Sequence, residues 1–250
     1  MHAAGIAINE DNSHFFGSRN PEAMTEAGLR ELVDHYAGPL TREVLFCVAG
    51  MRASYAATGW EPIWEGIEFA EDGTVRYGEN ELTGHAALWV RNARALHEEG
   101  LNPYAFWLAY AREQGVSPWI TMRMNDIHSV DNPGNYMHSD FWRENPDCRR
   151  VPYRFTRWQD AALDYGREEV RARALAQVGE LLETFDLDGL ELDWMRFGYH
   201  FRPGHEAEGR EQLTAFMREA RRLTERAAAR LGHPVQLGVR VPSRPDSAAE

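Results

Sequence analysis

The sequence predicts an α/β fold, a partial (β/α)8 barrel with about five βα units. Three observations lead to this prediction. Strand-like runs alternate with helical runs, each strand-like run has one apolar face, and the other face turns polar toward its carboxyl end. With 250 residues the chain can form one large domain, and we expect a single barrel domain over residues 1–250.

Strands and helices are predicted in alternation. The strands are expected at residues 4–9, 43–50, 117–124, 188–195 and 235–241. The helices are expected at residues 21–37, 83–99, 103–114, 164–185 and 208–231. In the fourth helix, Val170, Ala174 and Val178 recur at helical spacing, which is typical of an amphipathic helix packed on a sheet.

The two faces of each strand favour a barrel over a doubly wound sheet. In the fourth strand, Leu190 and Leu192 lie on one face and Glu191 and Asp193 on the other. The residues expected to face helices in the first, third and fifth strands are Ile6, Ile8, Ile120, Met122, Met124, Val235, Leu237, Val239 and Val241. A doubly wound sheet buries both faces under helices, whereas a barrel sends one face inward and has its chemistry at the strands' carboxyl ends.

The number of strands is smaller than a closed barrel requires. A barrel of this type has eight strands, and the sequence supplies five. Long connections at 52–82 and 125–163 take up the remaining length. We therefore expect a fragment that lacks its last three βα units. The alternative is a complete, open five-stranded α/β domain.

Composition argues against several classes of protein. A net charge of -12 disfavours nucleic-acid binding, and all 27 basic residues are arginine, which excludes a Schiff-base lysine and a Walker-type loop. No apolar run is long enough to span a membrane. The first residues lack the features of a secretory signal, so a cytoplasmic location is expected. Cys47 and Cys148 form neither a disulfide framework nor a zinc pattern.

The clearest chemical signal is the pair Glu191 and Asp193. Their Cα atoms should be about 6–7 Å apart on one strand face. Burial of two like charges is unfavourable unless arginines or a substrate compensate. Mutual repulsion favours one protonated and one ionised group, which is the combination that glycoside hydrolysis uses. The alternative is a structural network in which Arg123, Arg196 and Arg240 neutralise the pair.

A second polar group follows the strand at 117–124. It consists of Arg123, Asn125, Asp126 and His128. These side chains suit hydrogen bonds to sugar hydroxyls, although loop capping and ordinary salt bridges would explain each residue equally well. His138 and Asp131 could join Asp126 and His128 as metal ligands, but the spacing matches no known ligand pattern, and no metal or cofactor is predicted.

The fourth predicted strand resembles a motif of a known family. Residues 188–194 (DGLELDW) are similar to the D-G-x-D-x-D-x-E strand of the chitinase family, with Glu191 at the middle aspartate and Asp193 at the last. The pattern departs from that family at Met195, which occupies the position of the chitinase acid.

A wider resemblance covers the whole chain. The stretch 188–201 (DGLELDWMRFGYHF), with segments 12–20, 117–128, 138–145 and 238–245, resembles bacterial glycoside-hydrolase-like barrels of unassigned specificity. The resemblance implies a barrel and a carbohydrate substrate. It also implies Asp193 as nucleophile or electrostatic stabiliser, Glu191 as its partner or as a sugar-hydroxyl acceptor, and a proton donor on a later strand.

The sequence therefore predicts a cofactor-free glycoside hydrolase. Its substrate-binding candidates are Asn9, Asp11, Arg123, Asn125, Asp126, His128, Arg196, Tyr199, His200 and Arg240. Aromatic residues in or near the long loops could stack on sugar rings, although most should pack within the loops. They are Trp60, Trp64, Tyr136, Trp142, Trp158, Tyr199 and Phe201. The alternatives are a degenerate barrel that binds glycans without cleaving them, and a metal-dependent hydrolase.

Overall fold

A parallel sheet forms the centre of the protein. The computed structural model describes residues 5–243. The sheet has the order β1-β2-β6-β7-β8, and its strands are β1 (Ile6–Glu10), β2 (Thr41–Cys47), β6 (Ser117–Arg123), β7 (Gly189–Asp193) and β8 (Gln236–Arg240). The five predicted strands are thus confirmed, with ends that differ by at most three residues. Residue 4, where the first strand was expected to begin, lies outside the described residues.

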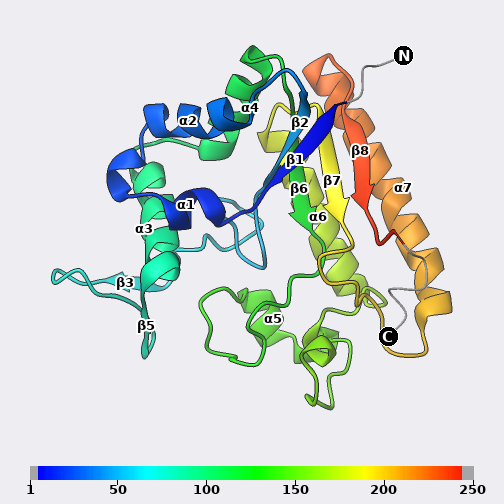
Figure 1. Cartoon of the computed structure of the whole chain (residues 1–250). Helices are drawn as coiled ribbons and strands as arrows, with labels where there is room; N and C mark the ends of the chain where they lie inside the picture. Colours follow the sequence, from blue (N-terminus) through cyan, green and yellow to red (C-terminus); the bar gives the residue numbers. More distant parts are fainter. Residues whose placement is uncertain (1–4, 244–250) are drawn as a thin grey trace.

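Helices connect the strands and lie beside the sheet (Figure 1). They are α1 (His14–Ser18), α2 (Glu26–Tyr36), α3 (Gly84–Glu98), α4 (Pro103–Glu113), α5 (Asp140–Glu144), α6 (Glu168–Thr184) and α7 (Glu206–Leu231), with 3-10 turns η1 (Pro21–Ala23), η2 (Pro146–Cys148) and η3 (Trp158–Ala161). The helix predicted from residue 21 begins at Glu26, because Thr25 caps it by accepting a hydrogen bond from the amide of Gly28. Asn102 caps α4 in the same way, and Pro103 follows it.

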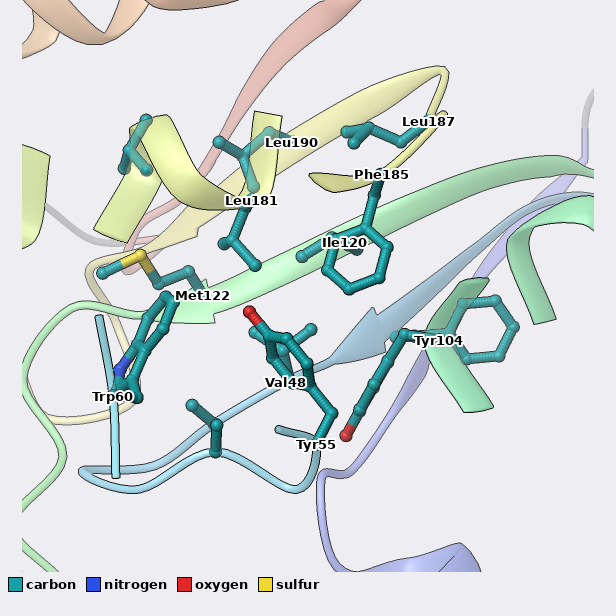
Figure 2. Packing of buried hydrophobic residues seen from close by; sticks show 14 of the residues in the cluster. Val48, Tyr55, Trp60, Tyr104, Ile120, Met122, Leu181, Phe185, Leu187 and Leu190 are labelled. Atoms are coloured by element: carbon teal, nitrogen blue, oxygen red, sulfur yellow. The ribbon is translucent and has the colours of Figure 1, made fainter. Parts of the chain in front are cut away.

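The helices cover one face of the sheet. The strands are neighbours in the order in which they occur along the chain, so right-handed crossovers place every connecting helix on the same side. One apolar cluster accordingly joins this face of β2, β6 and β7 to the helices. Figure 2 shows Ile120, Met122 and Leu190 of the strands beside Leu181 and Phe185 from the α6 region. The opposite face lies outside this cluster.

The opposite face is concave. Asn9 of β1 and Glu191 of β7 are separated by two intervening strands, which is about 14 Å in a flat sheet. Their side chains nevertheless approach to 3.4 Å between Asn9 Nδ2 and Glu191 Oε1. Side chains stand roughly perpendicular to a flat sheet and would not converge in this way. The five strands therefore curl around the polar face.

Two predictions about the periphery need correction. The connection at 52–82 contains a small antiparallel sheet of β3 (Ile67–Phe69), β4 (Val75–Tyr77) and β5 (Asn80–Leu82), where the sequence predicted a loop. Ile6, Val239 and Val241 were expected to face helices, but all three are about half exposed. The reason is that β1 and β8 are the edge strands of the described sheet.

Two glycines make room for Trp119 on the concave face. A Cβ atom at Gly189 would lie 2.4 Å from the Trp119 ring, and one at Gly238 would lie 3.0 Å from it. The indole thus fills the amino-terminal part of the concave face. Glu191 lies nearer the carboxyl ends of the strands than Trp119, because it is paired in register with Thr121, two residues further along β6.

The close contact between Gly189 and Trp119 is testable. Gly189→Ala should lower the free energy of unfolding by about 1–3 kcal/mol through overpacking, as measured by urea denaturation. Gly179→Ala is the matched control, because its Cβ would meet nothing within 4 Å in the middle of α6. That control should be neutral or stabilising by up to about 1 kcal/mol. Equal stability of the Gly189→Ala variant and the parent would contradict the packing described here.

Candidate active site

The concave face becomes more polar toward the carboxyl ends of the strands. The register aligns Trp119 with Gly189, Thr121 with Glu191, and Arg123 with Asp193. On the other side of β7, Asp193 is aligned with Arg240. Because parallel strands end at one edge of the sheet, Asp193, Arg123 and Arg240 form a charged row at that edge. Figure 1 shows α5 and its neighbouring loops beyond the ends of β6 and β7.

Glu191 is the more accessible of the two carboxylates. Its side chain is 15% exposed. Oε1 accepts a hydrogen bond of 2.7 Å from the Thr121 hydroxyl and one of 3.4 Å from Asn9 Nδ2. Arg240 Nη2 lies 3.5 Å from the same oxygen. One carboxylate oxygen is thus held in place by three groups, while Oε2 makes no hydrogen bond or ion pair with a described residue.

Asp193 is held more tightly and is shielded from solvent. Its side chain is 1% exposed, and Oδ1 accepts hydrogen bonds of 3.0 Å from the backbone amides of Met195 and Arg196. Oδ2 lies 2.7 Å from Arg240 Nη2. The two amides and the guanidinium together stabilise a negative charge on Asp193. The carboxylate also fixes the chain direction just after β7.

Arg123 links two further acids at the same edge. Its guanidinium pairs with Asp11, and Nη1 lies 3.2 Å from Asp126 Oδ2. Ser13 donates to Asp11 from its hydroxyl, at 2.8 Å, and from its amide, at 3.0 Å. Burial opposes ionisation of Asp11, but the charge of Arg123 and the Ser13 hydrogen bonds outweigh it and lower the pKa of Asp11.

Asp126 and His128 form a hydrogen-bonded pair beside this network. His128 Nδ1 lies 2.9 Å from Asp126 Oδ1, and His128 Nε2 lies 2.9 Å from Arg196 Nη2. A guanidinium only donates, so Nε2 accepts from Arg196, and Nδ1 therefore holds the proton that is donated to Asp126. Burial opposes ionisation of Asp126, but the hydrogen bonds from His128 and the charge of Arg123 lower its pKa.

The predicted role of Asn125 in substrate binding needs correction. Its Nδ2 donates to the carbonyl oxygens of Leu163 at 2.9 Å and Tyr199 at 2.8 Å. Its Oδ1 accepts from the amide of Leu163 at 3.0 Å. The amide group is therefore fully used in tying two loops together, and the side chain is buried. Asn125 supports the loops instead of binding sugar.

His200 and Tyr199 also lie within the packing of the loops. His200 Nε2 donates to the carbonyl of Trp194 at 2.8 Å, and its ring packs edge-on against Tyr165 and Trp194. The Tyr199 ring packs edge-on against Trp158 and lies under the guanidinium of Arg150. The His200 imidazole was predicted to contact substrate, and this packing turns it toward the protein interior instead.

Most of the predicted aromatic contacts are packing. Trp60, Tyr136, Trp142 and Phe201 are buried. Trp64 stacks on His97, and Trp158 stays substantially exposed. The expectation that most of these rings are packed within the protein is therefore confirmed.

Thr121 and Trp119 belong to the site and were not identified as site residues from the sequence. Thr121 donates the shortest hydrogen bond that Glu191 accepts, and Trp119 forms the floor beneath it. Both alternate along β6 with the apolar residues that face the helices. That alternation predicts that they point toward the concave face. Their chemical role depends on the neighbouring strand, which the sequence of β6 alone does not specify.

Among residues 5–243, no group of three or more His, Cys, Asp or Glu side chains is arranged to hold a metal ion. His138, one of the alternative metal ligands, places Nε2 2.9 Å from the carbonyl oxygen of His128. In the same part of the chain, no helix combines the length and apolar character that a membrane crossing requires.

Neither a protein-family model nor a curated protein matches the chain. Similar solved structures include the galactosidase domain of the alpha-galactosidase-sucrose kinase AgaSK, with 16% identity, a TM-score of 0.47, and coverage of 95% of this chain and 27% of that chain. Alpha-L-fucosidase isoenzyme 2 from Paenibacillus thiaminolyticus has 13% identity, a TM-score of 0.48 and coverages of 93% and 32%. The alpha-galactosidase TtGalA from Thermus thermophilus has 17% identity, a TM-score of 0.43 and coverages of 98% and 40%.

The chain thus spans less than half the length of each of these enzymes. With TM-scores below 0.5 and identities below 20%, the likeness establishes neither a closed barrel nor an activity for this chain.

The environment of His200 predicts an acid-sensitive contribution to stability. Burial lowers its pKa from 6.5 to about 4, against weaker opposing effects of the Trp194 carbonyl and the Asp193 charge. Between these values the unfolded chain binds a proton that the folded protein does not, so stability falls as the pH decreases through this window.

His200→Gln keeps a donor for the Trp194 carbonyl and removes the titration. We expect the parent to lose up to about 3 kcal/mol more unfolding free energy than this variant across the window. Urea denaturation at a series of pH values measures the difference. Identical acid sensitivity of the two proteins would exclude His200 as the responsible group.

Proposed function

We propose that this chain is a carbohydrate-active domain, a segment of a (β/α)8 barrel, with Glu191 and Asp193 at the reaction centre of a glycoside hydrolase. One observation carries the proposal. The two carboxylates lie on the concave face at the carboxyl end of β7, and both contact Arg240. Barrel enzymes have their chemistry at this end of the strands, and glycoside hydrolysis uses paired carboxylates.

The sheet topology supports the barrel part of the proposal. Consecutive strands are neighbours throughout, without the reversal of strand order that defines a doubly wound sheet. The helices cover one face, and the contact of Asn9 with Glu191 requires strong curvature toward the other. Each of these features is expected of consecutive βα units in a barrel.

Glu191 is the carboxylate that we assign to contact with the substrate. Thr121, Asn9 and Arg240 fix one of its oxygens, and the other is free of protein partners among the described residues. A carboxylate held in this way is positioned for proton transfer or for attack at a sugar carbon. Arg123 and Asp11 lie at the same edge, where they would bind hydroxyl groups of the sugar.

Asp193 is assigned the role of electrostatic stabiliser. Its burial and its pairing with two amides and Arg240 keep it from reaching a substrate directly. Its negative charge instead offsets the charge of Arg240, which lies between the two carboxylates. In a reaction that develops positive charge on the sugar ring, a fixed anion nearby lowers the barrier.

One observation favours a second function, carbohydrate binding without cleavage. Asp193, which the family resemblance makes the nucleophile or an electrostatic stabiliser, is only 1% exposed. Met195 follows in place of a chitinase-type acid, and its side chain is exposed. A domain that has lost one catalytic group would retain the polar concave face and its ability to bind sugars.

The glycosidase proposal is tested by turnover of a panel of p-nitrophenyl glycosides of both anomeric configurations. Glu191→Gln should reduce kcat by about 10²–10⁴-fold, because it removes a group that transfers a proton or attacks the sugar. Asp193→Asn should also reduce kcat, and it should lower stability because Arg240 loses its buried partner.

Asp188→Asn is the matched control for these variants. Asp188 precedes the same strand at its opposite end, where it binds Arg112 at 2.8 Å and Ser117 at 2.9 Å. It should leave kcat unchanged. Unchanged kcat in Glu191→Gln would remove Glu191 from the mechanism. Sugar binding without hydrolysis of any glycoside in the panel would favour the binding function.

A further inference from the structure

A groove of about 800 Å³ opens beyond the carboxyl ends of β6 and β7. Its walls are residues 127–131 and 155–159, and Phe197 completes the lining. None of these residues belongs to the charged row of Asp193, Arg123 and Arg240. The groove is therefore a separate feature of the loops, beside the candidate active site.

Aromatic rings line the groove and remain open to solvent. Trp158 is 44% exposed and Phe155 is 51% exposed. The Trp158 ring packs edge-on against Phe197 and Tyr199, with centroid distances of 5.9 Å and 5.4 Å. These contacts fix the orientation of the indole without covering it. A fixed aromatic surface of this kind stacks on the apolar face of a sugar ring.

A buried carboxylate holds the aromatic loop in shape. Asp160 accepts hydrogen bonds from the amides of Thr156 and Arg157, from the Thr156 hydroxyl, and from Arg154. Burial opposes its ionisation, but these bonds lower the pKa of Asp160 to about 2. The loop that carries Phe155 and Trp158 is thus preorganised, which limits the entropy lost on binding.

Polar groups stand beside the exposed rings. His128, Asp131 and Arg157 line the groove, and so does Gln159. The Oε1 atom of Gln159 is shielded from solvent and accepts no hydrogen bond from a described residue. Aromatic surface together with hydrogen-bonding groups matches a ligand that is apolar on one ring face and rich in hydroxyls at its rim.

Arg196 connects the groove to the reaction centre. Its backbone amide donates to Asp193 Oδ1, and its guanidinium donates to Nε2 of His128 at the groove wall. Arg196 therefore contacts both Asp193 and the wall of the groove.

We propose that the groove is a subsite for a neighbouring sugar unit, which stacks on Trp158 and Phe155, so that the substrate is an oligosaccharide. This inference rests on the proposed function, because it places the scissile bond at Glu191 and the next unit in the groove. Gln159 would bind a hydroxyl group of that unit.

The test is calorimetric titration of the protein with cello-, xylo-, malto- and chito-oligosaccharides from the monosaccharide to the hexasaccharide. For at least one series, affinity should rise from one sugar unit to two or three. Trp158→Ala and Phe155→Ala should each abolish that rise and weaken oligosaccharide binding about tenfold, through loss of a stacked ring face. Tyr153→Ala is the matched control, because this exposed aromatic of the same loop does not line the groove.

The variants separate this inference from the proposed function. Glu191→Gln should keep the Trp158-dependent binding even where turnover is lost. Trp158-dependent binding without hydrolysis in the parent would refute the glycosidase and retain the subsite. Hydrolysis whose dependence on chain length is unaffected by both groove variants would retain the glycosidase and overturn the subsite. Absence of Trp158-dependent binding in all four series would overturn it as well.

Discussion

The site depends on one structural constraint, the coverage of the sheet by helices on a single face. The strands' own side chains must fill the opposite face, which curls until residues of β1 and β7 meet. Near the amino ends this filling is apolar, with Trp119 seated over Gly189 and Gly238. Near the carboxyl ends it is polar, so that charged groups are brought together in a partly dry environment where their interactions are strong.

The charged groups at this end of the sheet are stable because each acid has an arginine or backbone amides as partners. Arg240 contacts Glu191 and Asp193, and Arg123 contacts Asp11 and Asp126. A buried carboxylate without such partners would be protonated or would destabilise the fold. The planar guanidinium contacts two acids at once in both cases, which a lysine ammonium does less well. The arrangement thus explains how four acids share one end of the sheet.

The sequence predicted the sheet well because strands have a strict period of two. That alternation placed Glu191 and Asp193 together on the polar face and Leu190 in the core, as observed. Asn125 and His200 were misassigned because loop residues carry no such period. The contacts of Asn125 lie 38 and 74 residues away along the chain, and no local pattern encodes them. The strands β3 to β5 were not predicted, because each is only three residues long. The Asp72-Gly73 pair between β3 and β4 is nevertheless a hairpin signal.

The different burial of the two carboxylates decides how variants should be interpreted. Asp193 holds the amide of Arg196, and the Arg196 side chain reaches the wall of the groove. A change at Asp193 therefore perturbs the charge at the reaction centre, the path of the chain after β7 and the groove together. Glu191 has no such structural connections, because its partners are Thr121, Asn9 and Arg240 on the concave face. Loss of activity at Glu191 consequently reports on chemistry, whereas loss at Asp193 combines chemistry with positioning.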